Sequence, residues 1–393
     1  MADARNRWPV SARALTTAEN NTNYAFLRLA SILCIFSSLF SLGFGPPALI
    51  ESDAARLPVR VQQLPQFAPV PPPKLTANAA VIMDFDSGRV LWEKNANLRV
   101  APASTTKMMT GLLAMEQGRL SDKVTIDWKH LVGYASMGLW IGDVVTIEDL
   151  LWGMFLPSAN EAAEAVADHV GGSEENFVKM MNDKAAELGL KNTRYMNPHG
   201  LDEEGHYSSA YDLAVTARAI LQYPLINQMS ATLERTIYAS RPIRLVNSNT
   251  LLRMQDAAPG VDGFKTGYTG DAGNCLVATA ARNGHRILTV VMGADNRNDD
   301  SVEILNYAFN NFVWTTLPTP ATAAFLDETG IVHHFEMPAK RTLLIRPWEK
   351  WWISLNLSFD RHSLPGVPPI SLGLASYSIA GSKVAEYPLK VKD

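Results

Sequence analysis

Hydrophobic and polar positions follow two different periods along residues 77–315. Two short apolar runs, 79–85 and 89–92, flank Asp86-Ser87-Gly88 and predict a β-hairpin. Apolar positions then recur at helical spacing, with Ser173 and Ser209 placed as N-cap residues. They predict helices at 147–155, 161–170, 173–188 and 211–222, the last stopped by Pro224.

Strand-like runs return after this helical region. They lie at 263–267, 275–280 and 286–292, and the turn signal Asn283-Gly284 joins the last two as an antiparallel hairpin. A helix is expected at 302–312. The predicted fold class is therefore α/β, in the form of an α+β sandwich: an antiparallel sheet covered by helices, with an all-helical insert.

The pattern changes again beyond Pro318-Thr319-Pro320. Four further runs, at 331–336, 341–345, 351–355 and 384–389, predict a small C-terminal β-rich domain over residues 316–393. Trp348, Trp351 and Trp352 lie beside or within one of them. We expect these rings to pack in the core at alternate strand positions rather than to contact a membrane or a partner.

The N-terminal region predicts export across a membrane. Residues 29–44 are apolar and uncharged, and four arginines precede them. Cleavage after Ala54 would make residues 1–54 a cytoplasmic tail with a signal peptide, whereas retention would make them a membrane anchor, and both readings stay open. Residues 55–76 are proline-rich and predict an extended linker, so the catalytic body is expected at 77–315.

Composition narrows the classes of function. The chain has 393 residues and a formal net charge of -4, which gives no general attraction to nucleic acid. Its two cysteines are Cys34, inside the apolar N-terminal segment, and Cys275, so we expect no disulfide framework.

The first candidate for chemistry is the pair Ser104 and Lys107. Residues three apart share a face of a helix, so a helix starting near Pro102 would place the Ser104 hydroxyl beside the Lys107 amine. Alone, the pair is typical of a helix cap and a solvated charge. If the lysine is desolvated, however, it becomes a neutral base that can take the proton of a nucleophilic serine.

Two more short motifs follow in order. Ser158-Ala159-Asn160 lies in a predicted loop between helices, and Lys265-Thr266-Gly267 in a predicted strand. Each is common as a cap, turn or strand end. The order Ser-x-x-Lys, Ser-x-Asn, Lys-Thr-Gly within this arrangement of elements is far more specific.

That set resembles the penicillin-recognising serine acyltransferases. Within them the chain is most similar to the low-molecular-mass penicillin-binding proteins that act as D-alanyl-D-alanine carboxypeptidases. The likeness extends over about residues 77–315 and rests further on the runs 197–202, 206–213 and 261–269. It implies a β-lactamase/transpeptidase-like fold and a role in peptidoglycan biosynthesis and cell shape.

The resemblance also implies catalytic roles for four residues. Ser104 would be the nucleophile and Lys107 its base. Ser158 would relay the proton to the departing D-alanine, and Asn160 would hold Lys107 and the substrate amide. No cofactor is needed for this chemistry.

Substrate binding is implied for the third motif. Lys265 and Thr266 would bind the terminal carboxylate of the substrate, and Gly267 would let the peptide lie against the strand. The backbone N–H groups of Ser104 and Tyr268 would form the oxyanion hole.

Two neighbouring features are expected to have no role in catalysis or metal binding. Arg297, in a polar run after the last strand, is expected to be solvated. His199 and His206, with Asp202, Glu203 and Glu204 between them, lack a helical metal-binding pattern, so we expect a polar loop and no metal site.

Three hypotheses remain. The first is a serine-type D-Ala-D-Ala carboxypeptidase that is inhibited by penicillin; the others are a β-lactamase and a non-catalytic cell-wall-binding relative. Ala159, where β-lactamases usually carry aspartate, and the C-terminal domain favour the first. Expected partners are peptidoglycan stem peptides and β-lactams. The expected location is the extracytoplasmic face of a bacterial plasma membrane or the periplasm, with any membrane association falling to residues 29–44, because residues 389–393 form no amphipathic helix.

Overall fold

The computed structural model describes residues 70–117, 119–318, 323–326, 332–336, 341–359 and 373–391. The predicted apolar segment at 29–44, Cys34 and most of the linker at 55–76 lie outside the described residues. Among the helices within those ranges, none has the length and apolar character needed to cross a membrane.

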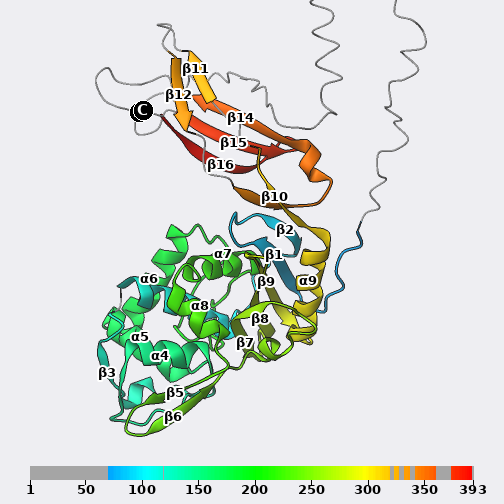
Figure 1. Cartoon of the computed structure of the whole chain (residues 1–393). Helices are drawn as coiled ribbons and strands as arrows, with labels where there is room; N and C mark the ends of the chain where they lie inside the picture. The colour runs from blue at the N-terminus through cyan, green and yellow to red at the C-terminus, as the bar shows by residue number, and fades with distance from the viewer. Residues whose placement is uncertain are drawn as a thin grey trace, which may run out of the picture. The chain divides into compact units, whose positions relative to one another are not determined.

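A five-stranded antiparallel sheet forms the centre of the larger part of the chain (Figure 1). Its strands, in spatial order, are β2 (Val90–Lys94), β1 (Ala79–Asp84), β9 (His285–Ala294), β8 (Gly273–Arg282) and β7 (Val261–Thr269). The hairpin predicted before Ser104 and the Asn283-Gly284 hairpin are both confirmed. Since β7 lies at the end of this order, none of the described strands lies beside one of its edges.

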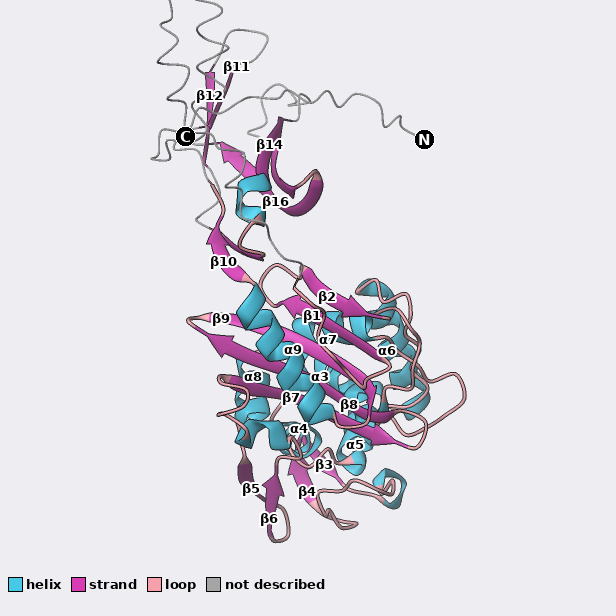
Figure 2. Ribbon diagram, turned by 90° about the vertical axis from the view of Figure 1, so that its right-hand side faces the viewer, coloured by secondary structure: helices cyan, strands magenta, loops and turns pink. Residues whose placement is uncertain are grey.

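Helices cover both faces of this sheet. Six successive residues in the middle of β8 and of β9 are buried, as expected for strands packed on both sides. Helix α9 (Arg297–Asn311) covers one face, and the helical region lies against the other (Figure 2). The predicted fold class is therefore confirmed.

The helical region contains every helix predicted there. Its helices are α3 (Lys107–Gln117), α4 (Ile147–Phe155), α5 (Asn160–Gly171), α6 (Glu174–Glu187), α7 (Ala210–Ile220) and α8 (Pro224–Ala231). Ser173 and Ser209 cap α6 and α7 as expected. The sequence pattern does not predict helix α8, because it treats Pro224 as the end of the preceding helix. In the structure Pro224 occupies the first turn of a new helix, where its missing N–H costs nothing.

Short 3₁₀ turns and two small hairpins complete this part. The turns are η3 (Ala103–Thr106), η4 (Trp128–His130) and η5 (Thr250–Arg253), and the hairpins pair β3 (Lys123–Thr125) with β4 (Val144–Thr146) and β5 (Glu234–Tyr238) with β6 (Pro242–Val246). Helix α3 is buried along most of its length, and it contacts α4, α5, α6 and α7. The residues that precede α3 are thereby held rigidly at the edge of the core.

The described chain divides into two compact units. The larger comprises Pro71–Thr316 and Thr342–Trp351, and the smaller includes the described residues of Leu317–Arg341 and Trp352–Asp393. In the larger unit β10 (Val313–Thr316) pairs with β13 (Thr342–Ile345). The smaller unit holds an antiparallel sheet in the order β11 (Ala323–Leu326), β12 (Val332–Glu336), β16 (Ser382–Val391), β15 (Gly373–Ile379) and β14 (Ile353–Phe359).

The tryptophan cluster differs from the prediction. Residues 349–352 form a 3₁₀ turn, η6 (Glu349–Trp352), and the strand begins only at Ile353. Trp351 and Trp352 are 63% and 57% exposed, so the expectation of core packing is wrong for both rings. A helical turn abolishes the alternation on which that expectation rested.

Candidate active site

Ser104 lies in the tight turn η3, immediately before helix α3. Ala103, just before it, has a φ of +49°, a left-handed conformation that L residues rarely adopt. The Ser104 side chain is partly exposed, whereas every residue from Thr105 to Ala114 is buried. The turn therefore leaves one hydroxyl accessible at the end of a buried helix.

The Lys107 amine is completely buried directly behind that hydroxyl. Its Nζ lies 2.9 Å from Ser104 Oγ, 2.7 Å from Asn160 Oδ1 and 2.7 Å from the backbone oxygen of His199. The last two atoms can only accept hydrogen bonds, since Asn160 Nδ2 is committed to Gly133 O at 2.7 Å. A neutral amine would give its two hydrogens to these acceptors and turn its lone pair toward the Ser104 hydroxyl.

The electrostatics favour this neutral form. Burial holds the pKa of Lys107 well below its usual range, and the positive charge of Lys265 lowers it further. The carboxylate of Glu161 acts in the opposite direction and raises the pKa of Lys107. Lys107 therefore favours the uncharged form that a base requires.

Ser158 and Asn160 occupy the turn that leads into helix α5. Ser158 has a φ of +68°, and Asn160 is the first residue of the helix rather than part of the preceding loop. Both side chains are buried. This turn aims the Asn160 amide at Lys107 and the Ser158 hydroxyl at Lys265.

Lys265 approaches from strand β7. Its Nζ lies 2.8 Å from Ser158 Oγ and 2.9 Å from the backbone oxygen of Thr266. Complete burial lowers the pKa of Lys265 to about 7, and the nearby Arg297 contributes in the same direction. A bound anion would raise that pKa again, so this lysine is prepared to receive a carboxylate.

The rest of the Lys-Thr-Gly motif faces the same place. The Thr266 hydroxyl lies 2.8 Å from Ser248 Oγ, and Tyr268 is 66% exposed. A Cβ atom on Gly267 would lie 3.1 Å from Pro102 O and 3.2 Å from the Ser104 backbone nitrogen. Glycine is therefore favoured here by the close approach of β7 to the Ser104 turn, a reason additional to substrate binding.

A pocket of about 600 Å³ opens beside these groups. Of the eight predicted site residues, Ser104, Ser158, Asn160, Thr266, Gly267 and Tyr268 line it. Lys107 and Lys265 lie behind the lining, in contact with Ser104 and Ser158. The structure thus brings all eight together around one opening.

Arg297 also lines the pocket, so the expectation that it is solvated is wrong. It is the first residue of α9, and its Nη1 donates to the backbone oxygen of Gly267 at 3.0 Å. Sequence reasoning also missed Tyr134, Leu201 and Ser248 in the lining. Tyr134 and Ser248 lie in none of the runs that carry the resemblance, and Leu201 lies in the run 197–202 but has no predicted role there. Only the fold brings these loops to the three motifs.

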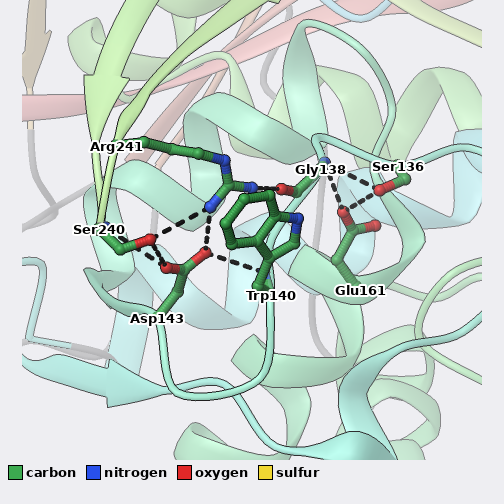
Figure 3. A network of polar contacts seen from close by, with 7 residues as sticks. All are labelled: Ser136, Gly138, Trp140, Asp143, Glu161, Ser240 and Arg241. Carbon is green, nitrogen blue, oxygen red and sulfur yellow. Dashed lines mark hydrogen bonds and ion pairs between the residues drawn. The ribbon is translucent and has the colours of Figure 1, made fainter.

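A polar network holds the loop that supplies Tyr134 (Figure 3). The Glu161 carboxylate accepts from the backbone N–H groups of Met137 at 2.7 Å and Gly138 at 3.2 Å, and from the Ser136 hydroxyl. Asn160 N–H also donates to Ala135 O at 2.8 Å. The first turn of α5 therefore fixes this wall of the pocket as well as Lys107.

The far end of the same loop is tied to the β5–β6 hairpin. Arg241 bonds the Gly138 carbonyl, forms an ion pair with Asp143 at 3.2 Å, and lies 3.4 Å above the Trp140 ring (Figure 3). Ser240 donates to the same Asp143. The loop is thus braced from two sides.

The segment 197–200 closes the site behind Lys107. Asn197 Oδ1 accepts from Gly200 N–H at 2.7 Å, which shapes a turn whose His199 carbonyl points at Lys107 Nζ. Gly200 has a φ of +88°, and a Cβ atom there would lie 1.9 Å from Ala103 O. Only glycine fits between this segment and the Ser104 turn.

Gly200→Ala is therefore expected to destabilise the fold by about 2 kcal/mol or more, through backbone strain and the clash with Ala103. The melting temperature should fall by about 4 °C or more. Gly189→Ala is the matched control, because Gly189 has a similar φ of +72° but no atom near its Cβ position. Equal losses in the two variants, measured by thermal unfolding, would contradict the close packing described here.

The polar residues between His199 and His206 hold their own loop. His206 Nε2 lies 2.9 Å from Thr106 Oγ1, Asp202 accepts from Asp271 N–H at 3.2 Å, and Glu203 accepts from Asn197 Nδ2 at 3.0 Å. Burial lowers the pKa of His206 to about 4, so its ring is neutral. These contacts secure the segment that faces Lys107.

Comparisons with known proteins identify the family of this chain. The model of the D-alanyl-D-alanine carboxypeptidase family matches residues 66–296. The chain is 40% identical to D-alanyl-D-alanine carboxypeptidase DacF of Bacillus subtilis over 296 residues, 72% of each chain. It is 37% identical to DacA of Haemophilus influenzae over 62% of this chain and 64% of that relative.

The fold has a close counterpart among solved structures. Penicillin binding protein 5 from Haemophilus influenzae superposes with a TM-score of 0.71 at 30% identity, covering 82% of this chain and 98% of that one. Together with the family match over residues 66–296, this likeness extends well beyond the three motifs.

Proposed function

The chain belongs to the D-alanyl-D-alanine carboxypeptidase family and is a serine-type hydrolase, and we propose that it removes the terminal D-alanine of peptidoglycan stem peptides through an acyl-enzyme on Ser104. The observation that carries the proposal is the buried Lys107 amine, 2.9 Å from an accessible Ser104 hydroxyl. Residues 77–315 form the proposed catalytic domain, and residues 316–393, apart from Thr342–Trp351 in the larger unit, an accessory β-rich domain. Residues 1–54 and 55–76 are the proposed export segment and linker.

In the first step Lys107 takes the proton of Ser104. The serine oxygen then attacks the carbonyl carbon of the penultimate D-alanine and forms a tetrahedral intermediate. The backbone N–H groups of Ser104 and Tyr268 are proposed to stabilise its negative oxygen. Asn160 and the His199 carbonyl keep Lys107 in place, with its hydrogens turned away from the nucleophile.

Collapse of this intermediate breaks the peptide bond. Ser158 is proposed to relay to the departing amine the proton that Lys107 took from Ser104, which leaves Lys107 neutral again. The neighbouring Lys265 stabilises the Ser158 oxygen during this transfer. The product is free D-alanine and an ester on Ser104. Water activated by the same basic group then hydrolyses the ester and restores the serine.

Strand β7 is proposed to bind the substrate in two ways. It lies at the edge of the central sheet, so an extended peptide can add to it by backbone hydrogen bonds. The terminal carboxylate then meets Lys265, the Thr266 hydroxyl and Arg297, which all lie at or beside the pocket. Opposite charge in a partly buried site makes these contacts strong.

Arg297→Ala should therefore weaken substrate binding more than it slows the chemistry. Loss of a charge-assisted contact of about 1.5–3 kcal/mol predicts a KM increase of roughly 10- to 100-fold. Steady-state kinetics with a D-Ala-D-Ala peptide test this, with Arg253→Ala, in a separate turn, as the control. An unchanged KM would show that Arg297 does not contact the carboxylate.

Export places the proposed site outside the cytoplasm, where peptidoglycan is found. The family acts extracytoplasmically, and the apolar segment at 29–44 is proposed to deliver the chain to the outer face of the plasma membrane or to the periplasm. β-Lactams are proposed as inhibitors, because they present a reactive carbonyl and a carboxylate to the same groups.

The test is to incubate the purified protein with a pentapeptide ending in D-Ala-D-Ala and, separately, with penicillin. The carboxypeptidase predicts release of one D-alanine per peptide and a penicillin adduct that persists for many minutes. Rapid turnover of penicillin would instead identify a β-lactamase. Neither D-alanine nor an adduct would identify a non-catalytic wall-binding protein.

A further inference from the structure

Glu164, Glu174 and His199 come together from three separate segments behind the active site. Glu164 lies one turn beyond Asn160 on α5, Glu174 is the first residue of α6, and His199 belongs to the segment that faces Lys107. One potential ligand atom from each of the three lies within 4.8 Å of the other two. Their spacing along the chain gives no sign of this meeting.

Glu164 is the unusual member of the group. Its side chain is buried, with 7% of the residue exposed, and its Oε2 accepts no hydrogen bond from any described residue. A buried carboxylate without a partner is costly, and a second carboxylate nearby increases the cost. Burial, with the like charges of Glu174 and Asp168, raises the pKa of Glu164 to about 7, against the opposite charge of Lys129.

We propose that Glu164, Glu174 and His199 form a binding site for a divalent transition-metal cation such as Zn²⁺. Two carboxylate oxygens and one imidazole nitrogen are a donor set that suits this ion, with water as the fourth ligand. The cation supplies the positive partner that the buried Glu164 oxygen lacks. The site is distinct from the peptidase pocket, whose lining includes none of the three residues.

The three donor atoms need to move only a short distance to coordinate one ion. Ligands about 2.1 Å from a tetrahedral Zn²⁺ lie roughly 3.4 Å apart, so the three atoms must approach one another modestly. Glu174 can supply this movement, because it is exposed on the first turn of its helix. Glu164 and His199 are buried and already positioned.

The tautomer of His199 provides a second way to detect the bound cation. His199 Nδ1 accepts from Leu201 N–H at 3.2 Å, and burial lowers the pKa of its ring to about 3, so the ring is neutral with its hydrogen on Nε2. Coordination through Nε2 moves that hydrogen to Nδ1 and opens the contact with Leu201. Cation binding should therefore change the environment of the Leu201 amide.

The site would also brace the active site. The backbone oxygen of His199 accepts from Lys107 at 2.7 Å, and Asn160 lies on the same helix as Glu164. A cation joining α5, α6 and this segment fixes two of the contacts that position Lys107. These residues act as positioning groups and do not touch the substrate.

The test uses the full chain after treatment with a chelator, titrated with Zn²⁺ against a chromophoric competitor. The wild type should bind one more equivalent of Zn²⁺ than Glu164→Gln or Glu174→Gln. If the variants still bind this equivalent, the wild type should bind it at least about 10-fold more tightly. Zn²⁺ should raise the melting temperature of the wild type by about 3 °C or more. Glu175→Gln, which changes the next and equally exposed glutamate, is the matched control and should behave as wild type.

Zn²⁺ can also bind elsewhere on the chain, for example at the consecutive residues His333 and His334. Such binding is the same in the wild type and in all three variants, so it does not contribute to the difference between them. The NMR resonance of the Leu201 amide should shift on addition of Zn²⁺ in the wild type and in Glu175→Gln, and should not shift in Glu164→Gln or Glu174→Gln. Equal Zn²⁺ affinity in wild type, Glu164→Gln and Glu174→Gln would overturn the proposal. Since the readout is metal affinity, this outcome is distinguishable from a failure of the proposed peptidase function.

Discussion

Ser104→Ala should reduce the release of D-alanine from a D-Ala-D-Ala peptide by about 10⁴-fold or more. The substitution removes a hydroxyl that both contacts the buried Lys107 amine and remains partly exposed at the pocket. The rest of the site should stay intact, because Ser104 accounts for only one of the three contacts of Lys107. The measurement is kcat from quantified D-alanine.

Two controls make this result specific. Thermal unfolding should show a melting temperature close to that of the wild type. Ser136→Ala, which alters a hydroxyl in the loop of Figure 3 instead of the proposed nucleophile, should retain most of the activity. Residual activity within about 10-fold of wild type in Ser104→Ala would assign the nucleophile to another residue.

Lys107→Gln should slow acylation of Ser104 by penicillin by about 10³-fold, the usual contribution of a general base. The glutamine amide can still donate to the acceptors that now hold Lys107, but it has no basic lone pair. Rapid-quench measurement of adduct formation checks this, with the exposed Lys179→Gln as control. Similar acylation rates in the two variants would exclude Lys107 as the base.

The same base determines the pH dependence of the wild type. Only neutral Lys107 can accept the serine proton, so acylation should slow as the pH falls through the pKa of this lysine and level off above it. Burial and Lys265 hold that pKa well below its usual range, so the rate should be near its plateau well below the pH at which an exposed lysine loses its proton. A rate that still rises up to pH values near 10 would contradict a desolvated Lys107.

Local patterns account well for the parts of the fold that local physics determines. The N-caps Ser173 and Ser209 and the Asn283-Gly284 turn each fix a backbone conformation within a few residues, and the elements they bound were predicted correctly. Residues 342–351 show what local patterns cannot predict. Their place in the larger unit depends on pairing between β13 and β10 and on an ion pair of 2.9 Å between Arg89 and Glu349, which no local pattern reveals.

The same limit applies to the site. Seven of the eight predicted site residues belong to the three motifs, whose residue types and order are informative, and Tyr268 follows from the family resemblance. The structure gathers all eight around one pocket. Arg297 could not be identified from the sequence, since its chain neighbours are polar and its approach to Gly267 depends on how α9 follows the sheet. Glu164 likewise looks like an ordinary helix residue until α6 and His199 are placed beside it.

The most direct test of the central claim is to locate the penicillin adduct by mass spectrometry of proteolytic peptides. The account predicts one adduct per chain, on the peptide that contains Ser104, formed by the wild type and lost in Ser104→Ala. An adduct on any other peptide, or one of undiminished yield in Ser104→Ala, would contradict it.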